Sequence, residues 1–132
     1  MKLIQKQSKF TRMVADLIIY AYSMGYEITL GDAYRDPRLH GDMGIKKGYG
    51  SAKSFHKLRL AIDLNLFKDG KYLEGTSDHK PIGEWWESIG GTWGGRFKDG
   101  NHYSLDETPK AVLSGKQPHG ENHTELFDHQ QP

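Results

Sequence analysis

Residues 54–67 read Ser-Phe-His-Lys-Leu-Arg-Leu-Ala-Ile-Asp-Leu-Asn-Leu-Phe, and this stretch decides the fold. Its second half alternates apolar with small or polar residues, and the apolar positions are Leu60, Ile62, Leu64 and Leu66. A period of two predicts a core strand over residues 60–67, with its apolar side chains on one face. Asp63 points to the other face, where an aspartate is either solvated or part of a site.

His56 and Asp63 are both residue types that bind metal ions. In one continuous strand they would lie on opposite faces, roughly 23 Å apart at about 3.3 Å per residue. In a helix they would lie roughly 10 Å apart at about 1.5 Å per residue. Neither arrangement lets both contact one ion at about 2.1 Å. If they share a metal, the chain must turn at residues 57–59, before the strand begins.

A third candidate ligand, His102, follows the turn sequence Asp99-Gly100-Asn101. Two imidazoles and one carboxylate are the ligand set of an open catalytic zinc site, in which water takes the fourth position. Asp99 then has two interpretations. It is an ordinary turn residue, or it is the proton carrier for the activated water, which would make the chain a hydrolase.

Composition narrows the class of protein. The chain has 132 residues, no cysteine and a net charge of +1. Any zinc must therefore be bound through nitrogen and oxygen. The near-neutral charge argues against a nucleic-acid partner, and no segment approaches the roughly 20 apolar residues of a membrane span. The length suits a single domain, which we expect to be a monomer.

Two helices are expected to pack on the sheet. Apolar residues recur at helical spacing after Ser8, a plausible N-cap, and Gly25 ends this helix. The charge of Asp16 and the lack of a cleavage site argue against a signal peptide here. A second helix should begin at Pro81 and end at Gly90, with its two tryptophans in the core.

Further strands are expected over residues 26–30, 71–73, 92–97 and 102–105, so the fold class is α+β with helices on one small antiparallel sheet. Residues 31–53 should form a long loop, and His40 and His79 are expected to be loop histidines. We expect one domain over residues 1–114. Residues 115–132, which have almost no apolar side chains, should form a disordered tail.

The motif Ser54-x-His56-x6-Asp63 followed by Asp99-x-x-His102 resembles the zinc peptidoglycan peptidases. This family includes D-Ala-D-Ala dipeptidases and carboxypeptidases and phage L-alanyl-D-glutamate endolysins. Its pattern is Ser-x-His-x-x-Gly-x-Ala-x-Asp followed by Glu or Asp-x-x-His. Tyr34-Arg35 is similar to the family's Tyr-Arg pair, and Trp93-Gly94-Gly95 is similar to phage members. The resemblance covers residues 28–105.

The resemblance implies that His56, Asp63 and His102 bind one zinc ion and that Asp99 is the general base and later the acid. It also implies roles for three further residues. Arg35 would hold the substrate carbonyl oxygen or its oxyanion, Ser54 would support the site by hydrogen bonding, and Trp93 would either wall the substrate cleft or pack in the core.

One position departs from the family pattern, because Arg59 stands where the family has glycine. Glycine suits the turn between the first two ligands. We expect Arg59 to adopt an ordinary backbone angle and to give a turn of different local geometry.

The resemblance implies a peptidoglycan hydrolase that cleaves the L-Ala-D-Glu bond of the wall peptide. The chain is most similar to a phage endolysin, which would accumulate in the host cytoplasm and reach the wall through a membrane lesion. Alternatives are a D-Ala-D-Ala carboxypeptidase, for which Arg59 or Arg96 would clamp the terminal carboxylate, and a noncatalytic metal-stabilised binding domain.

Overall fold

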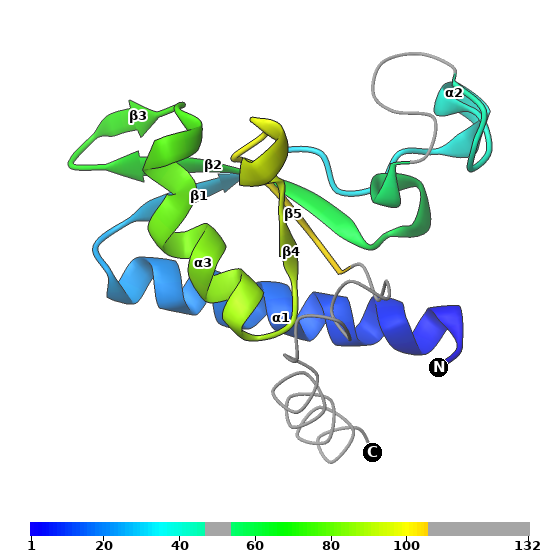
Figure 1. The fold of residues 1–132 in the computed structure, drawn as a ribbon, viewed down its shortest axis with the longest axis horizontal. Coiled ribbons are helices and arrows are strands. Elements are labelled where there is room, and N and C mark those ends of the chain that lie inside the picture. Colours follow the sequence, from blue (N-terminus) through cyan, green and yellow to red (C-terminus); the bar gives the residue numbers. More distant parts are fainter. Residues whose placement is uncertain (47–53, 106–132) are drawn as a thin grey trace.

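The computed structural model describes residues 1–46 and 54–105. The predicted domain end at residue 114 and the predicted tail lie outside these ranges. Within the described residues, helices pack on one antiparallel sheet of five strands, which confirms the α+β prediction (Figure 1).

Helix α1 spans Leu3–Ser23 and supplies one wall of the core. Its N-cap is Lys2, so the prediction that Ser8 caps the helix is wrong. Gly25 lies just beyond its end with φ of 89°, a conformation that glycine adopts without strain. The side chains that face the core follow the helical period, and they are Phe10, Met13, Leu17 and Ala21.

Strand β2, which spans Ala61–Lys68, is the centre of the sheet. The sheet order is β1-β2-β5-β4, and β3 also pairs with β2. The other strands are β1 (Glu27–Leu30), β3 (Lys71–Leu73), β4 (Thr92–Trp93) and β5 (His102–Ser104). The turn predicted at Asp69-Gly70 is confirmed, because both residues have positive φ and join β2 directly to β3.

Helix α3 spans Lys80–Ser88, with a proline in its first turn as predicted. The part of the chain that the structure describes also contains four single turns of helix: α2 (Pro37–His40), η1 (Phe55–Leu58), η2 (Thr76–His79) and η3 (Gly94–Phe97). The strand predicted over residues 92–97 is therefore mostly wrong, since it ends at Trp93 and η3 follows.

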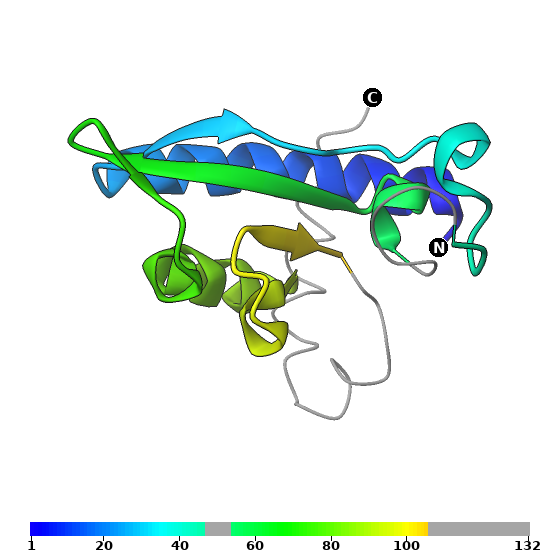
Figure 2. The ribbon, with the colours of Figure 1, turned by 90° about the horizontal axis from the view of Figure 1, so that it is seen from above.

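The core lies between the two longer helices and one face of the sheet. Helix α1 runs along β1 and β2 (Figure 2), and Phe10 meets Trp86 of α3 edge to face at 5.9 Å. The four alternating apolar residues of the β2 region are all buried. Their polar neighbour Asp63 lies on the opposite face. Among the described residues, no helix combines the length and apolarity of a membrane span.

Candidate metal centre

A 3-10 turn positions His56. The hydroxyl of Ser54 accepts a hydrogen bond from the His56 backbone N–H at 3.2 Å and so caps η1. Arg59 ends the turn, and β2 begins two residues later. The turn that the two-ligand hypothesis required at residues 57–59 is therefore present.

Arg59 adopts the left-handed conformation, with φ of 58° and ψ of 34°. The prediction of an ordinary backbone angle is wrong here. A side chain in this conformation costs about 1–2 kcal/mol, and the guanidinium group of Arg59 lies 4.0 Å from the centre of the Tyr34 ring. This stack offsets part of the strain, by about 0.5–1 kcal/mol at an exposed site.

Strand register brings Asp63 and His102 together. The two residues are direct partners across the antiparallel pair of β2 and β5, so their side chains lie on the same face of the sheet. On its other edge, the backbone N–H of Asp63 donates to the carbonyl of Asp32 at 2.8 Å. Asp63 is thus fixed in the interior of the sheet, as its place in the apolar strand predicted.

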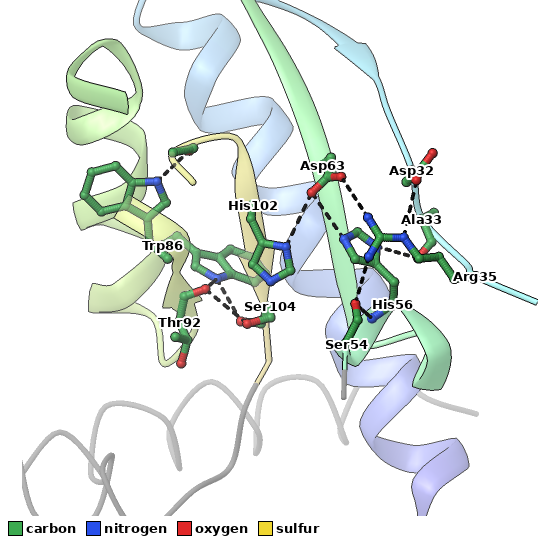
Figure 3. A network of polar contacts seen from close by, with 12 residues as sticks. Asp32, Ala33, Arg35, Ser54, His56, Asp63, Trp86, Thr92, His102 and Ser104 are labelled. Atoms are coloured by element: carbon green, nitrogen blue, oxygen red, sulfur yellow. Dashed lines mark hydrogen bonds and ion pairs between the residues drawn. The ribbon is translucent and has the colours of Figure 1, made fainter. Parts of the chain in front are cut away.

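The three predicted ligands converge in space (Figure 3). The Nε2 atom of His56 lies 3.2 Å from Oδ1 of Asp63, and the Nδ1 atom of His102 lies 3.4 Å from the same oxygen. One ligand atom from each residue lies within 4.8 Å of the others. The His56 side chain is 1 % exposed, whereas His102 and Asp63 are 21 % and 19 % exposed. One side of the cluster is therefore open to solvent.

The donor set fits a metal ion. The Nδ1 atom of His56 faces the carbonyl oxygen of Ala33 at 3.0 Å, and a proton on Nδ1 leaves the Nε2 lone pair directed at the Asp63 carboxylate. Two acceptor atoms at such a distance need positive charge between them, from a proton or a metal. Neighbouring ligands of a tetrahedral zinc ion, each about 2.1 Å from it, lie about 3.4 Å apart. The two distances to Asp63 match that spacing.

Asp63 is ionised in this environment. Burial acts to raise the pKa of the Asp63 carboxyl, but hydrogen bonds with His102 and His56 outweigh burial and hold this pKa well below its ordinary value. Residual negative charge in a partly buried cluster favours a cation.

Arg35 contacts the metal centre through the Asp63 carboxylate. Its side chain is 12 % exposed, and its Nη2 atom lies 3.8 Å from Oδ2 of Asp63, the carboxylate oxygen that faces away from the histidines. Its Nη1 atom donates to the Ser54 hydroxyl at 3.1 Å, and its Nε atom pairs with Asp32 at 3.4 Å. Arg35 and Ser54 thus support the ligands. The contact of Arg35 with a substrate stays a prediction.

The predicted base, Asp99, is exposed at the surface, three residues before His102. Its backbone carbonyl accepts a hydrogen bond from the His102 N–H at 3.1 Å, and its own N–H donates to Gly94 at 3.0 Å. The backbone of Asp99 therefore forms part of a turn, as the first of its two interpretations predicted. The metal-binding group found among the described residues does not include Asp99, and its role as a base stays a prediction.

Trp93 belongs to the core and not to a cleft wall. It is 8 % exposed, and its indole N–H donates to the carbonyl of Gly100 at 2.7 Å. The ring lies between Gly83 and Gly95, where an added Cβ would come within 2.1–2.3 Å of it. The prediction that Trp93 binds substrate does not fit this position, because the ring surface is already covered.

Two histidines that we expected in loops are buried instead. His79 is 2 % exposed, and its Nδ1 atom lies 2.8 Å from the hydroxyl of Tyr103 on β5. His40, at the end of α2, is 3 % exposed. The Ala33 carbonyl that orients His56 could not be predicted from the sequence, because a backbone acceptor has no residue signature.

Comparison with known proteins agrees with this site. Residues 47–105 match the sequence model of a family described as D-alanyl-D-alanine carboxypeptidase. The matched segment contains all three converging ligands and Asp99. No curated protein matches the chain. The fold, the ligand cluster and the family match support a metallopeptidase of the zinc type.

Proposed function

We propose that this protein is a zinc-dependent peptidoglycan peptidase that cleaves the L-Ala-D-Glu bond of the wall peptide. The observation that carries the proposal is the convergence of His56, Asp63 and His102 within 4.8 Å. They lie inside a segment that matches a family of cell-wall peptidases. A structural zinc site closes its fourth position with protein, whereas this cluster is open on one side.

His56, Asp63 and His102 would hold the zinc ion, which supplies a Lewis acid for the peptide carbonyl and activates water. Ala33 keeps the proton of His56 on Nδ1, so that Nε2 remains a ligand. Arg35 holds the outer oxygen of Asp63 and leaves Oδ1 to face the histidines. The Asp99 carboxylate accepts the proton of the attacking water and passes it to the leaving amine.

The bond that the protein cleaves depends on whether the site binds the terminal carboxylate of a peptide. An endopeptidase needs a cleft through which substrate continues on both sides, whereas a carboxypeptidase needs a cation for a terminal carboxylate. Arg96, one of the two candidate clamps, is paired with Glu87 at 3.3 Å. This pairing argues against Arg96 as the clamp and leaves Arg59 as the other candidate. The family description favours D-Ala-D-Ala carboxypeptidase activity, which is the second candidate.

The biological setting belongs to the same proposal. The similarity of Trp93-Gly94-Gly95 and Asp99-x-x-His102 to phage members supports an endolysin that acts as a monomer on bacterial peptidoglycan during phage lysis. Such a protein would be made in the host cytoplasm and would meet the wall after membrane permeabilisation. Antimicrobial activity of the added protein would follow from the same reaction.

Product mapping tests the proposal. Purified peptidoglycan is incubated with the zinc-loaded protein, and the released peptides are sequenced by mass spectrometry, with Asp99→Asn protein as the control. New N-terminal D-Glu would support the endopeptidase. Release of free D-Ala alone would replace it with the carboxypeptidase, and intact peptidoglycan in the presence of zinc would refute both activities.

A further inference from the structure

Arg59 stands out among the arginines of this chain. The other four each pair with a carboxylate: Arg12 with Asp16, Arg35 with Asp32 and Asp63, Arg38 with Asp36, and Arg96 with Glu87. Within residues 1–46 and 54–105, Arg59 makes no side-chain hydrogen bond or ion pair, and its contact is the face of Tyr34. Among these residues, no partner therefore occupies the hydrogen-bonding edges of its guanidinium.

An acidic residue whose carboxyl is affected by the charge of Arg59 is already paired. Hydrogen bonds from the side chain and backbone of Arg38 lower the pKa of Asp36 to about 2, and the charge of Arg59 makes the smallest contribution to this shift. The Arg38 guanidinium holds both carboxylate oxygens of Asp36. The charge of Arg59 thus affects the pKa of Asp36, but the carboxylate of Asp36 is hydrogen-bonded to Arg38.

Stacking on Tyr34 orients the Arg59 side chain. The guanidinium carbon of Arg59 lies 4.0 Å over the centre of the Tyr34 ring, and an arginine stacked on an aromatic ring keeps its planar fork of N–H donors for another partner. That is the arrangement in which arginine binds a carboxylate through two parallel hydrogen bonds. The left-handed backbone of Arg59 adds strain that is typical of residues held for function.

The pair lies beside the metal centre. The backbone carbonyl of His56 accepts hydrogen bonds from the N–H of Arg59 at 3.3 Å and from the N–H of Arg35 at 3.1 Å. Tyr34 directly precedes Arg35 and directly follows Ala33, whose carbonyl holds the His56 ring. Both members of the pair are therefore attached to the turn that carries a metal ligand.

We propose that the Arg59–Tyr34 pair, defined by these two side chains, binds a substrate carboxylate next to the scissile bond. The inference rests on the proposed peptidase function and specifies its substrate. D-glutamate has two carboxyl groups, and the peptide chain continues through one of them. The other is a free anion immediately after the L-Ala-D-Glu bond. A terminal D-Ala-D-Ala peptide offers the same chemistry through its chain end.

Matched substrates test this proposal. One pair of peptides contains the L-Ala-D-Glu bond with the free glutamate carboxylate either intact or converted to the amide. A second pair ends in D-Ala-D-Ala with a free or amidated terminus. Wild-type protein should cleave the carboxylate form of its own substrate with kcat/KM about tenfold or more above the amide form, as expected for a hydrogen-bonded ion pair.

The variant Arg59→Gly should lose this preference, mainly through a higher KM for the carboxylate form. Its rate on the amide form and its zinc affinity should stay at wild-type values. Arg59→Lys keeps the charge without the planar fork and should keep only part of the preference. Arg12→Gln controls for loss of one positive charge. Asp69→Gly, at another left-handed residue with φ of 52°, controls for relief of backbone strain.

An unchanged carboxylate preference in Arg59→Gly would overturn the proposal. An equal fall in kcat/KM on both peptide forms would also overturn it, because it would mean that the stack only supports the turn that carries His56. If wild-type protein cleaves none of the four peptides, the peptidase function fails. The carboxylate proposal is then judged by equilibrium binding of the same peptides to the zinc-loaded protein. Tighter binding of a carboxylate form that disappears in Arg59→Gly supports it, and equal binding of both forms refutes it.

Discussion

Replacing Gly94 with alanine should damage the metal centre without touching a ligand. A Cβ atom at Gly94 would lie 2.3 Å from the carbonyl oxygen of Asp99 and 2.9 Å from the Cβ of His102. Cβ atoms essentially never approach other atoms more closely than 3.0 Å. The backbones at residue 94 and at Asp99 would have to move apart by at least 0.7 Å, the difference between 3.0 Å and 2.3 Å.

This shift would displace groups that the proposed reaction needs. The displaced carbonyl of Asp99 is the acceptor for the His102 N–H at 3.1 Å, so the predicted base and a ligand move together. Loss of a supporting contact typically weakens metal binding by about 10–100-fold. Misplacement of reacting groups by about 1 Å costs about 100-fold in rate. Overpacking should also destabilise the fold by about 1–3 kcal/mol.

The assay compares three quantities: zinc affinity by competition with a chelator, peptidoglycan hydrolysis, and the free energy of unfolding in urea. Gly91→Ala is the matched control, because its Cβ would meet the buried ring of Trp86 at 2.1 Å, away from the ligands. The free energy of unfolding should fall in both variants. Only Gly94→Ala should also lose zinc affinity and peptidoglycan hydrolysis. Wild-type zinc affinity and turnover in Gly94→Ala would refute the reasoning.

Three further predictions follow from the site and its surroundings. Saturating zinc should raise the melting temperature, since a ligand at 100 times its Kd stabilises by about 2.7 kcal/mol. His56→Ala and His102→Ala should abolish this rise, and full zinc occupancy of either variant by metal analysis would contradict the ligand assignment. Asp99→Asn should retain zinc and fold while losing hydrolysis by about 100-fold or more; near-normal turnover would remove Asp99 from the mechanism. Burial lowers the pKa of His79 from 6.5, and the charge of Asp78 opposes this shift. As the pH falls, His79 therefore binds a proton more readily in the unfolded chain than in the folded protein. The free energy of unfolding should therefore fall as pH drops below about 6.5, and urea titrations at pH 7.5 and 5 should show a smaller fall in His79→Gln.

Local patterns were sufficient to predict the centre of the fold. The alternation around Ile62 and Leu64 predicted both the strand and the face on which Asp63 lies, because a period of two leaves no other choice. The incompatible spacing of His56 and Asp63 predicted the intervening turn, since no regular element brings them to one ion. These inferences use distances along the chain only.

Nonlocal packing explains what the sequence did not predict. Trp93 is buried because Gly83 and Gly95 leave room for its ring. Gly83 lies ten residues before Trp93 in the sequence and so gives no local signal of this packing. His79 is buried because Tyr103 meets it from a distant strand. At Arg59, local preference predicted an ordinary backbone angle, but the tertiary position of the turn imposed the left-handed one.

The pairing of Asp63 with His102 has a consequence for protein engineering. Between these two partners the chain makes the exposed Asp69-Gly70 turn, pairs β3 with β2 and packs α3 in the core, so of these parts only the turn can change in length while β2 and β5 pair in the same way. A slip of one residue in this pairing would turn His102 to the opposite face, and a slip of two would move it along the strand by about 7 Å. The Asp69-Gly70 turn is therefore a place to graft a wall-binding module, whereas the two strands tolerate no insertion.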